Sequence, residues 1–95
     1  MKLDQLRTKR HEIFSLAEKH GARNIRVFGS TARGEAGAES DIDLLIDVGD
    51  HPSPFFPGGL LVDLEELLEC KVDIVTEKSL HWYIRDRILQ EALPL

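Results

Sequence analysis

The sequence contains a single cysteine, Cys70, and no long hydrophobic run. A lone cysteine excludes an internal disulfide and is typical of a reducing compartment. The N-terminus lacks the apolar run of a signal peptide, and no stretch is long enough to span a bilayer. We therefore expect a cytoplasmic protein without membrane contact. Cys70 lies in an apolar helical pattern, so we interpret it as a packing residue rather than a nucleophile.

The length limits what the chain can contain. With 95 residues, of which 42% are hydrophobic, there is enough apolar material for one core, so residues 1–95 are expected to form a single domain. A domain of this size can hold a catalytic centre or a binding surface. It has little room for a second domain that binds a large substrate, which would have to bring its own surface.

Basic residues are scarce after the first third of the chain. Residues 1–34 carry a net charge of +5 and residues 35–95 a net charge of −10. An acidic domain binds nucleic acid poorly, so direct nucleic-acid binding is not expected. The basic first third could face phosphates or an acidic partner, or could be a solvated helix face.

Hydrophobic periodicity predicts an α+β domain. Helical spacing indicates a first helix over residues 2–20 and a later one over residues 60–69. A last helix is predicted over residues 79–93, with Ser79 as its N-cap. Short strands are indicated by "NIRVFG", "DIDLLIDV" and "KVDIVT". The expected architecture is a small mixed three-stranded sheet packed against helices.

The strand "DIDLLIDV" alternates between an apolar face and an acidic face. The face expected to pack on helices carries Ile42, Leu44, Ile46 and Val48. The opposite face carries Asp41, Asp43, Leu45 and Asp47. Side chains at i and i+2 on a strand lie about 6–7 Å apart, so the first two acids can converge on one or two cations.

A third carboxylate, Asp73, lies between Val72 and Ile74 in the following strand. If the two strands are neighbours, Asp73 falls beside Asp41 and Asp43. Carboxylate oxygens are the ligands that Mg²⁺ prefers, and a site with two such ions suits phosphoryl transfer. A lone Asp-x-Asp pair is more often a solvated sheet edge. The third acid and the turn before the pair favour the metal site here.

That turn, Gly29-Ser30, follows a predicted strand. Glycine lets the backbone approach a phosphate closely, and Ser30 adds a hydroxyl donor. Arg33 adds a planar fork of donors for phosphate oxygens. A Gly-Ser pair, ten residues and then Asp41-x-Asp43 form a specific combination, although the glycine and serine alone carry almost no information.

The stretch "GSTARGEAGAESDIDLLI" resembles the Gly-Ser-x10-Asp-x-Asp signature of the DNA polymerase beta-like nucleotidyltransferases. The chain is most similar to their minimal nucleotidyltransferase (MNT) family. The similarity also covers the basic first helix, "LEELLECKVDIVT" and "YIRDRILQEAL", and thus nearly the whole chain. It implies a fold like the polymerase beta palm.

The resemblance also implies a role for each signature position. The family positions that hold the nucleotide triphosphate are here Gly29, Ser30 and Arg33. Those that hold the metal are Asp41, Asp43 and Asp73. Two Mg²⁺ ions and ATP as substrate are the family expectation. Asp73 would complete the second metal site and help to activate the acceptor hydroxyl. No signature position is missing.

MNT proteins are typically paired with a HEPN-domain ribonuclease toxin. The resemblance therefore implies an antitoxin that moves AMP from ATP to a tyrosine of its HEPN partner. A second hypothesis is an antidote that neutralises the toxin by forming a complex, and a third is a nucleotidyltransferase that acts on a small molecule or an RNA end.

Other candidate residues have less specific interpretations. Asp47 is interpreted as a rim or structural acid, and Trp82 and Tyr83 as core or interface residues. In the loop "GDHPSPFFPGG", Phe55 and Phe56 are either an exposed partner anchor or loop residues packed onto the core. The histidines show no metal-ligand spacing; they are His11, His20, His51 and His81.

Overall fold

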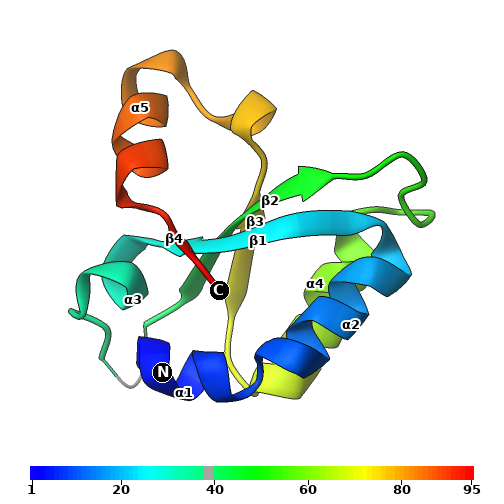
Figure 1. Cartoon of the computed structure of the whole chain (residues 1–95), viewed down its shortest axis with the longest axis horizontal. Coiled ribbons are helices and arrows are strands. Elements are labelled where there is room, and N and C mark those ends of the chain that lie inside the picture. Colours follow the sequence, from blue (N-terminus) through cyan, green and yellow to red (C-terminus); the bar gives the residue numbers. More distant parts are fainter. Residues whose placement is uncertain (38–39) are drawn as a thin grey trace.

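The computed structural model describes residues 1–37 and 40–95 (Figure 1). In chain order the elements are α1 (Leu3–Thr8), α2 (Arg10–His20), β1 (Ala22–Phe28), α3 (Gly29–Arg33), β2 (Ile42–Val48), α4 (Gly58–Leu68), β3 (Val72–Val75), the 3-10 turn η1 (Glu77–Ser79), α5 (Trp82–Glu91) and β4 (Leu93–Pro94). Within these described residues, no helix is long and apolar enough to cross a membrane.

The strands form one mixed sheet in the order β3-β2-β1-β4. Strand β2 pairs antiparallel with β1 and parallel with β3, and β1 pairs antiparallel with β4. The mixed α+β architecture confirms the predicted fold class. The sheet has four strands rather than the predicted three, because Leu93–Pro94 adds a short edge strand. Two residues including a proline show no alternation, and an edge strand is one of the few places where a sheet tolerates proline.

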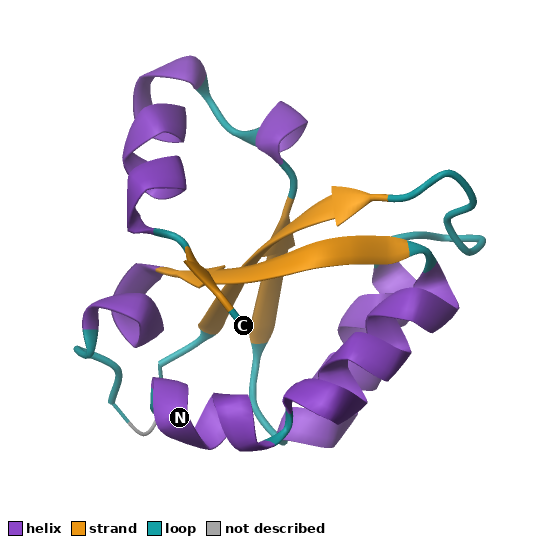
Figure 2. Ribbon diagram, viewed as in Figure 1, coloured by secondary structure: helices purple, strands orange, loops and turns teal. Residues whose placement is uncertain are grey.

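The core lies between the sheet and the helices α1, α2 and α4. Figure 2 shows α2 and α4 packed together beside the sheet. From β2, Ile42, Leu44 and Ile46 are at most 1% exposed and point into this core. Val48 does not belong to it: at the end of the strand it is 42% exposed, contrary to the prediction. Leu45 is fully buried on the opposite face.

Two helix boundaries differ from the predictions. The first helix is interrupted at Lys9, whose N–H bonds to the carbonyl of Leu6 and whose Nζ donates to Leu67. The last helix begins at Trp82, and Ser79 ends η1, where its hydroxyl donates to the Thr76 carbonyl. A serine beside a helical pattern predicts a cap, but the hydroxyl bonds locally to whichever turn is formed.

The aromatic side chains of the long loop and of α5 differ in exposure. Phe55 is 93% exposed, as expected of a partner anchor, whereas Phe56 packs against the core, as expected of an ordinary loop residue. Trp82 and Tyr83 are 85% and 66% exposed, which excludes a core role. Both lie on α5, a helix without a buried residue.

Candidate active site

Asp43 and Asp73 are directly paired across the parallel strands β2 and β3. Their side chains therefore share one face of the sheet. Asp41 immediately precedes β2, two residues before Asp43. Asp41 and Asp73 are exposed, and Asp43 is partly buried between them and β1. The prediction that Asp73 lies beside the aspartate pair is confirmed.

The three carboxylates bring like negative charges close together, and Arg33 offsets them only in part. Burial raises the pKa of Asp43, and the nearby carboxylates of Asp73 and Asp41 raise it further, while Arg33 opposes them. A bound cation would relieve this repulsion. The donors are all oxygens, so the residues present fit Mg²⁺.

The carboxylates are not already arranged around a single point. Within residues 1–37 and 40–95, no three His, Cys, Asp or Glu side chains come together as a ready metal site. Asp41 and Asp73 are exposed and therefore free to change rotamer. Their assignment as metal ligands stays a prediction.

The Gly-Ser turn packs directly against Asp43. Phe28, the last residue of β1, is paired with Asp43, and Gly29 follows with a φ of 73°. A Cβ atom on Gly29 would overlap Oδ2 of Asp43. The turn therefore requires glycine for two reasons, its positive φ and the carboxylate beside it. Ser30 and Arg33 follow in α3, at the same edge of the sheet.

Two acids that the sequence analysis missed bind the turn and its arginine. Glu91 Oε2 accepts a hydrogen bond from the Gly29 N–H at 3.0 Å, and Glu91 Oε1 pairs with Arg33 Nη1. Glu35 accepts from Arg33 Nε at 2.9 Å. The hydrogen bonds that Arg33 donates to Glu35 and Glu91 raise the pKa of Arg33 above its ordinary value. No local pattern marks Glu91, because only the packing of α5 brings it to the turn.

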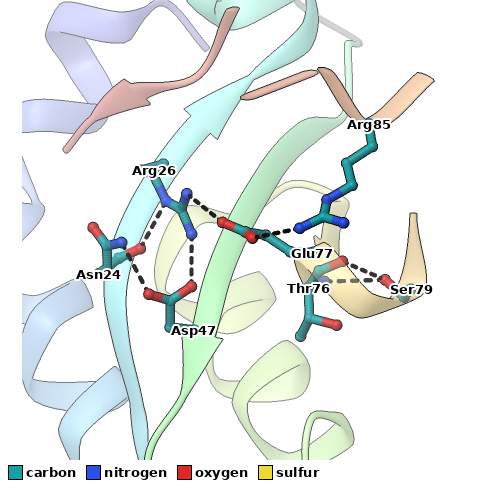
Figure 3. A network of polar contacts seen from close by, with 7 residues as sticks. All are labelled: Asn24, Arg26, Asp47, Thr76, Glu77, Ser79 and Arg85. Carbon is teal, nitrogen blue, oxygen red and sulfur yellow. Dashed lines mark hydrogen bonds and ion pairs between the residues drawn. The ribbon is translucent and has the colours of Figure 1, made fainter. Parts of the chain in front are cut away.

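Asp47 belongs to a separate polar network (Figure 3). It accepts hydrogen bonds from Arg26 at 2.8 Å and from Asn24 at 3.0 Å. Arg26 also pairs with Glu77, which in turn pairs with Arg85 of α5. Because these bonds link β1, β2, η1 and α5, Asp47 is a structural acid, as the sequence predicts.

The remaining candidates are structural as well. Burial raises the pKa of the Cys70 thiol, which packs against the core and is a poor nucleophile in this state. Nδ1 of the buried His20 lies 2.8 Å from Ser53 Oγ, and its Nε2 lies 2.7 Å from Asp63 Oδ2.

An apolar cavity of about 330 Å³ lies near Phe14 and is lined by none of the predicted site residues.

Comparison with known proteins identifies the kind of domain. The profile of the family described as "Nucleotidyltransferase domain" matches residues 10–95. The chain belongs to this nucleotidyltransferase family. The nucleotidyltransferase class predicted from the sequence is thereby confirmed. The MNT resemblance is confirmed by the relatives and the solved structure described next.

Individual relatives agree with this assignment. Protein adenylyltransferase MntA of Thermococcus cleftensis is 42% identical over 78 residues, which cover 82% of this chain and 79% of MntA. A second relative is MJ0435 of Methanocaldococcus jannaschii, which is named as a candidate protein adenylyltransferase. It is 38% identical over 93 residues, which cover 98% of this chain and 97% of MJ0435.

Solved structures support the same fold. A candidate minimal nucleotidyltransferase has a TM-score of 0.86 and 44% identity, covering 100% of this nucleotidyltransferase chain and 97% of its own. A toxin–antitoxin structure with AMP-PNP has a TM-score of 0.72 and 22% identity, covering 88% and 69% respectively. At that identity the second likeness concerns the fold alone.

Proposed function

We propose that residues 1–95 act as a single Mg²⁺-dependent protein adenylyltransferase domain. In this proposal the enzyme moves AMP from ATP to a hydroxyl, a tyrosine by family expectation, of a partner HEPN ribonuclease toxin, and thereby acts as the antitoxin. The observation that carries the proposal is the position of Asp43, which is crowded by Asp73 and Asp41 and packed against the Gly29 turn. The cytoplasmic location expected from the single cysteine is part of the same proposal.

The proposed reaction is an in-line attack of the acceptor hydroxyl on the α-phosphate. The hydroxyl oxygen forms the new P–O bond, the bond to the β-phosphate breaks, and pyrophosphate leaves. Mg²⁺ held by Asp41, Asp43 and Asp73 would neutralise phosphate charge and lower the pKa of the acceptor. Asp73, which the family resemblance assigns to activation of the acceptor, is exposed at the site, and its oxygen would accept the proton.

The chain's own residues would chiefly position the nucleotide. The hydroxyl and N–H of Ser30 would donate to phosphate oxygens, and Arg33 would contribute its remaining guanidinium donors. The absence of a side chain on Gly29 lets the turn lie against Asp43, so the phosphates and the acids meet at one edge of the sheet. Positioning and electrostatics are then the main sources of rate enhancement.

The proposal of a protein acceptor is supported by the names of the relatives. MntA of Thermococcus cleftensis is named a protein adenylyltransferase, and structures that share this fold include the toxin–antitoxin pair MntA–HepT. The net charge of −10 on residues 35–95 also suits a basic partner surface.

A second candidate function is neutralisation by complex formation alone. It is favoured by the exposed aromatic side chains of Phe55, Trp82 and Tyr83, since exposed apolar surface is typical of protein contacts. Transfer to a small molecule or an RNA end is the third alternative, and the acidic balance of the chain argues against RNA.

The direct test uses α-labelled ATP, Mg²⁺ and the protein encoded beside this one. Wild type is compared with Asp43→Asn and with Asp50→Asn, an exposed acid outside the site. Label on the partner with wild type and Asp50→Asn, but not with Asp43→Asn, is the expected result. A tight complex that blocks the partner without any label would favour the binding antidote and overturn the enzymatic proposal.

A further inference from the structure

Glu91 binds two groups that the proposed function assigns to the nucleotide-binding turn. Its carboxylate accepts from the Gly29 N–H with one oxygen and from the Arg33 guanidinium with the other. The Glu91 side chain is 17% exposed. Burial alone would raise the pKa of Glu91, but the hydrogen bonds from Arg33 and Gly29 outweigh it and lower the pKa, so the group is ionised at neutral pH.

The backbone near Glu91 is held by the sheet. Glu91 ends α5, and two residues later Leu93 pairs with Val27 of β1. At the other end of α5, Arg85 pairs with Glu77 at 3.3 Å. No residue of α5 is fully buried, so these polar and strand contacts, together with the half-buried Ile84, Ile88 and Leu89, hold the helix in place. Glu91 is therefore presented to the turn from a fixed position.

Two of the five N–H donors of Arg33 are already engaged. Nε donates to Glu35 and Nη1 to Glu91, while Nη2 has no partner within residues 1–37 and 40–95. A guanidinium held at two nitrogens presents the third in a defined direction. Because the Gly29 N–H is also engaged, Ser30 and the remaining N–H donors of Arg33, two of them on Nη2, are left for phosphate contacts in this proposal.

We infer that Glu91 is a positioning residue for the nucleotide: it clamps the Gly29 turn and orients Arg33 toward the triphosphate. This inference rests on the proposed function, because it needs the triphosphate to bind at Ser30 and Arg33. In this role Glu91 would act through Gly29 and Arg33, without touching the acceptor or the reacting phosphorus.

The test measures binding of α,β-methylene-ATP with Mg²⁺, since this analogue cannot undergo transfer. Calorimetry compares wild type, Glu91→Gln and Glu35→Gln, which removes the other carboxylate on Arg33 but no contact with Gly29. The matched control is Glu66→Gln, an exposed acid on α4. We expect Glu91→Gln to weaken binding on the order of tenfold, Glu35→Gln by less because the Gly29 contact stays, and Glu66→Gln to leave binding unchanged.

A double-mutant cycle tests whether Glu91 acts through Arg33. In an Arg33→Met background, Glu91→Gln should cause a smaller loss than in wild type, because the group that it orients is gone and only its contact with Gly29 remains. Glu91→Asp, which keeps the charge, should recover part of the affinity. Thermal unfolding and amide exchange at Gly29 report whether each variant is folded and whether the turn has loosened.

The outcomes separate the two proposals. Unchanged affinity in Glu91→Gln, or full additivity in the cycle, would overturn the positioning role alone. Tighter binding by Glu91→Gln would also overturn it, because the carboxylate would then be competing with phosphate. If wild type binds no nucleotide, the proposed function fails, and the positioning role fails with it.

Discussion

Gly29 lies so close to Asp43 that a Cβ atom on the glycine would overlap the carboxylate oxygen Oδ2. The two conspicuous parts of the signature, the Gly-Ser turn and the aspartate pair, are thus in direct contact in the fold. Strand pairing between β1 and β2 brings them together, because Phe28 is the register partner of Asp43. Changes at either residue should therefore affect both the turn and the acid.

The first prediction concerns Gly29→Ala. The variant should lose nucleotide binding and transfer, because its methyl group displaces Asp43 and strains a backbone with a φ of 73°. Gly34→Ala is the control: its φ is 76°, but a Cβ there meets no atom within 4 Å. The control should lose about 1–2 kcal/mol of stability and keep its activity. Equal activity of the two variants would contradict the steric argument.

The second prediction compares two acids on the same strand. Asp43→Asn should reduce transfer by at least about a hundredfold. At neutral pH, with a chelator present to remove divalent metal ions, Asp43→Asn should raise Tm, because it removes one negative charge from a crowded site. Asp47→Asn should lower stability by about 1 kcal/mol, since it weakens the bond to Arg26. Labelled transfer measures the loss of activity, and thermal unfolding measures the stability of both variants. A lower Tm for Asp43→Asn would contradict the proposed repulsion between the three carboxylates.

The third prediction concerns acid stability and Asp63. The hydrogen bond from His20 holds the pKa of Asp63 below its ordinary value. The resulting stabilisation is complete above the unfolded pKa of about 3.9 and is lost as the pH falls through the lower, folded pKa. The difference in urea unfolding between wild type and Asp63→Asn should be constant above about pH 5 and should shrink only as the pH falls below about 4. A difference independent of pH would exclude an ionised Asp63 as the cause.

The fourth prediction separates the two adjacent phenylalanines of the long loop. Phe56→Ala should lower the free energy of unfolding by about 1–3 kcal/mol, because Phe56 packs against the core. Phe55→Ala should leave stability within about 0.5 kcal/mol, since Phe55 is 93% exposed. If Phe55 contacts the proposed partner, complex formation should weaken in that variant only. Denaturant titration and a pull-down with the partner measure the two effects.

Local sequence patterns were sufficient for most of the secondary structure. Alternation predicted β2 and its acidic face, and helical periodicity predicted α2 and α4. The errors lie where several local solutions have similar energy. Ser79 can cap a helix or close a 3-10 turn, and tertiary contacts at Lys9 accompany the interruption of the first helix. The two-residue strand β4 has no local pattern at all.

The site was predictable only in part, because some of its residues are neighbours in the chain and others meet only through the fold. The spacing of Gly29, Ser30, Asp41 and Asp43 is a property of one continuous stretch and could be read directly. The position of Asp73 required the assumption that β3 adjoins β2, which the parallel register then confirmed. Its role, like that of the other site residues, stays a prediction.

The sequence by itself determined most of the helices and strands, which face of β2 is acidic, and that a glycine turn precedes the aspartate pair. These are local properties, set by the periodicity of the chain and by backbone freedom. Only the tertiary structure decided that Asp73 lies beside Asp43 and that Glu91 reaches Gly29 and Arg33. Such contacts join residues far apart in the chain, and they depend on strand order and helix placement, which follow from packing of the whole domain.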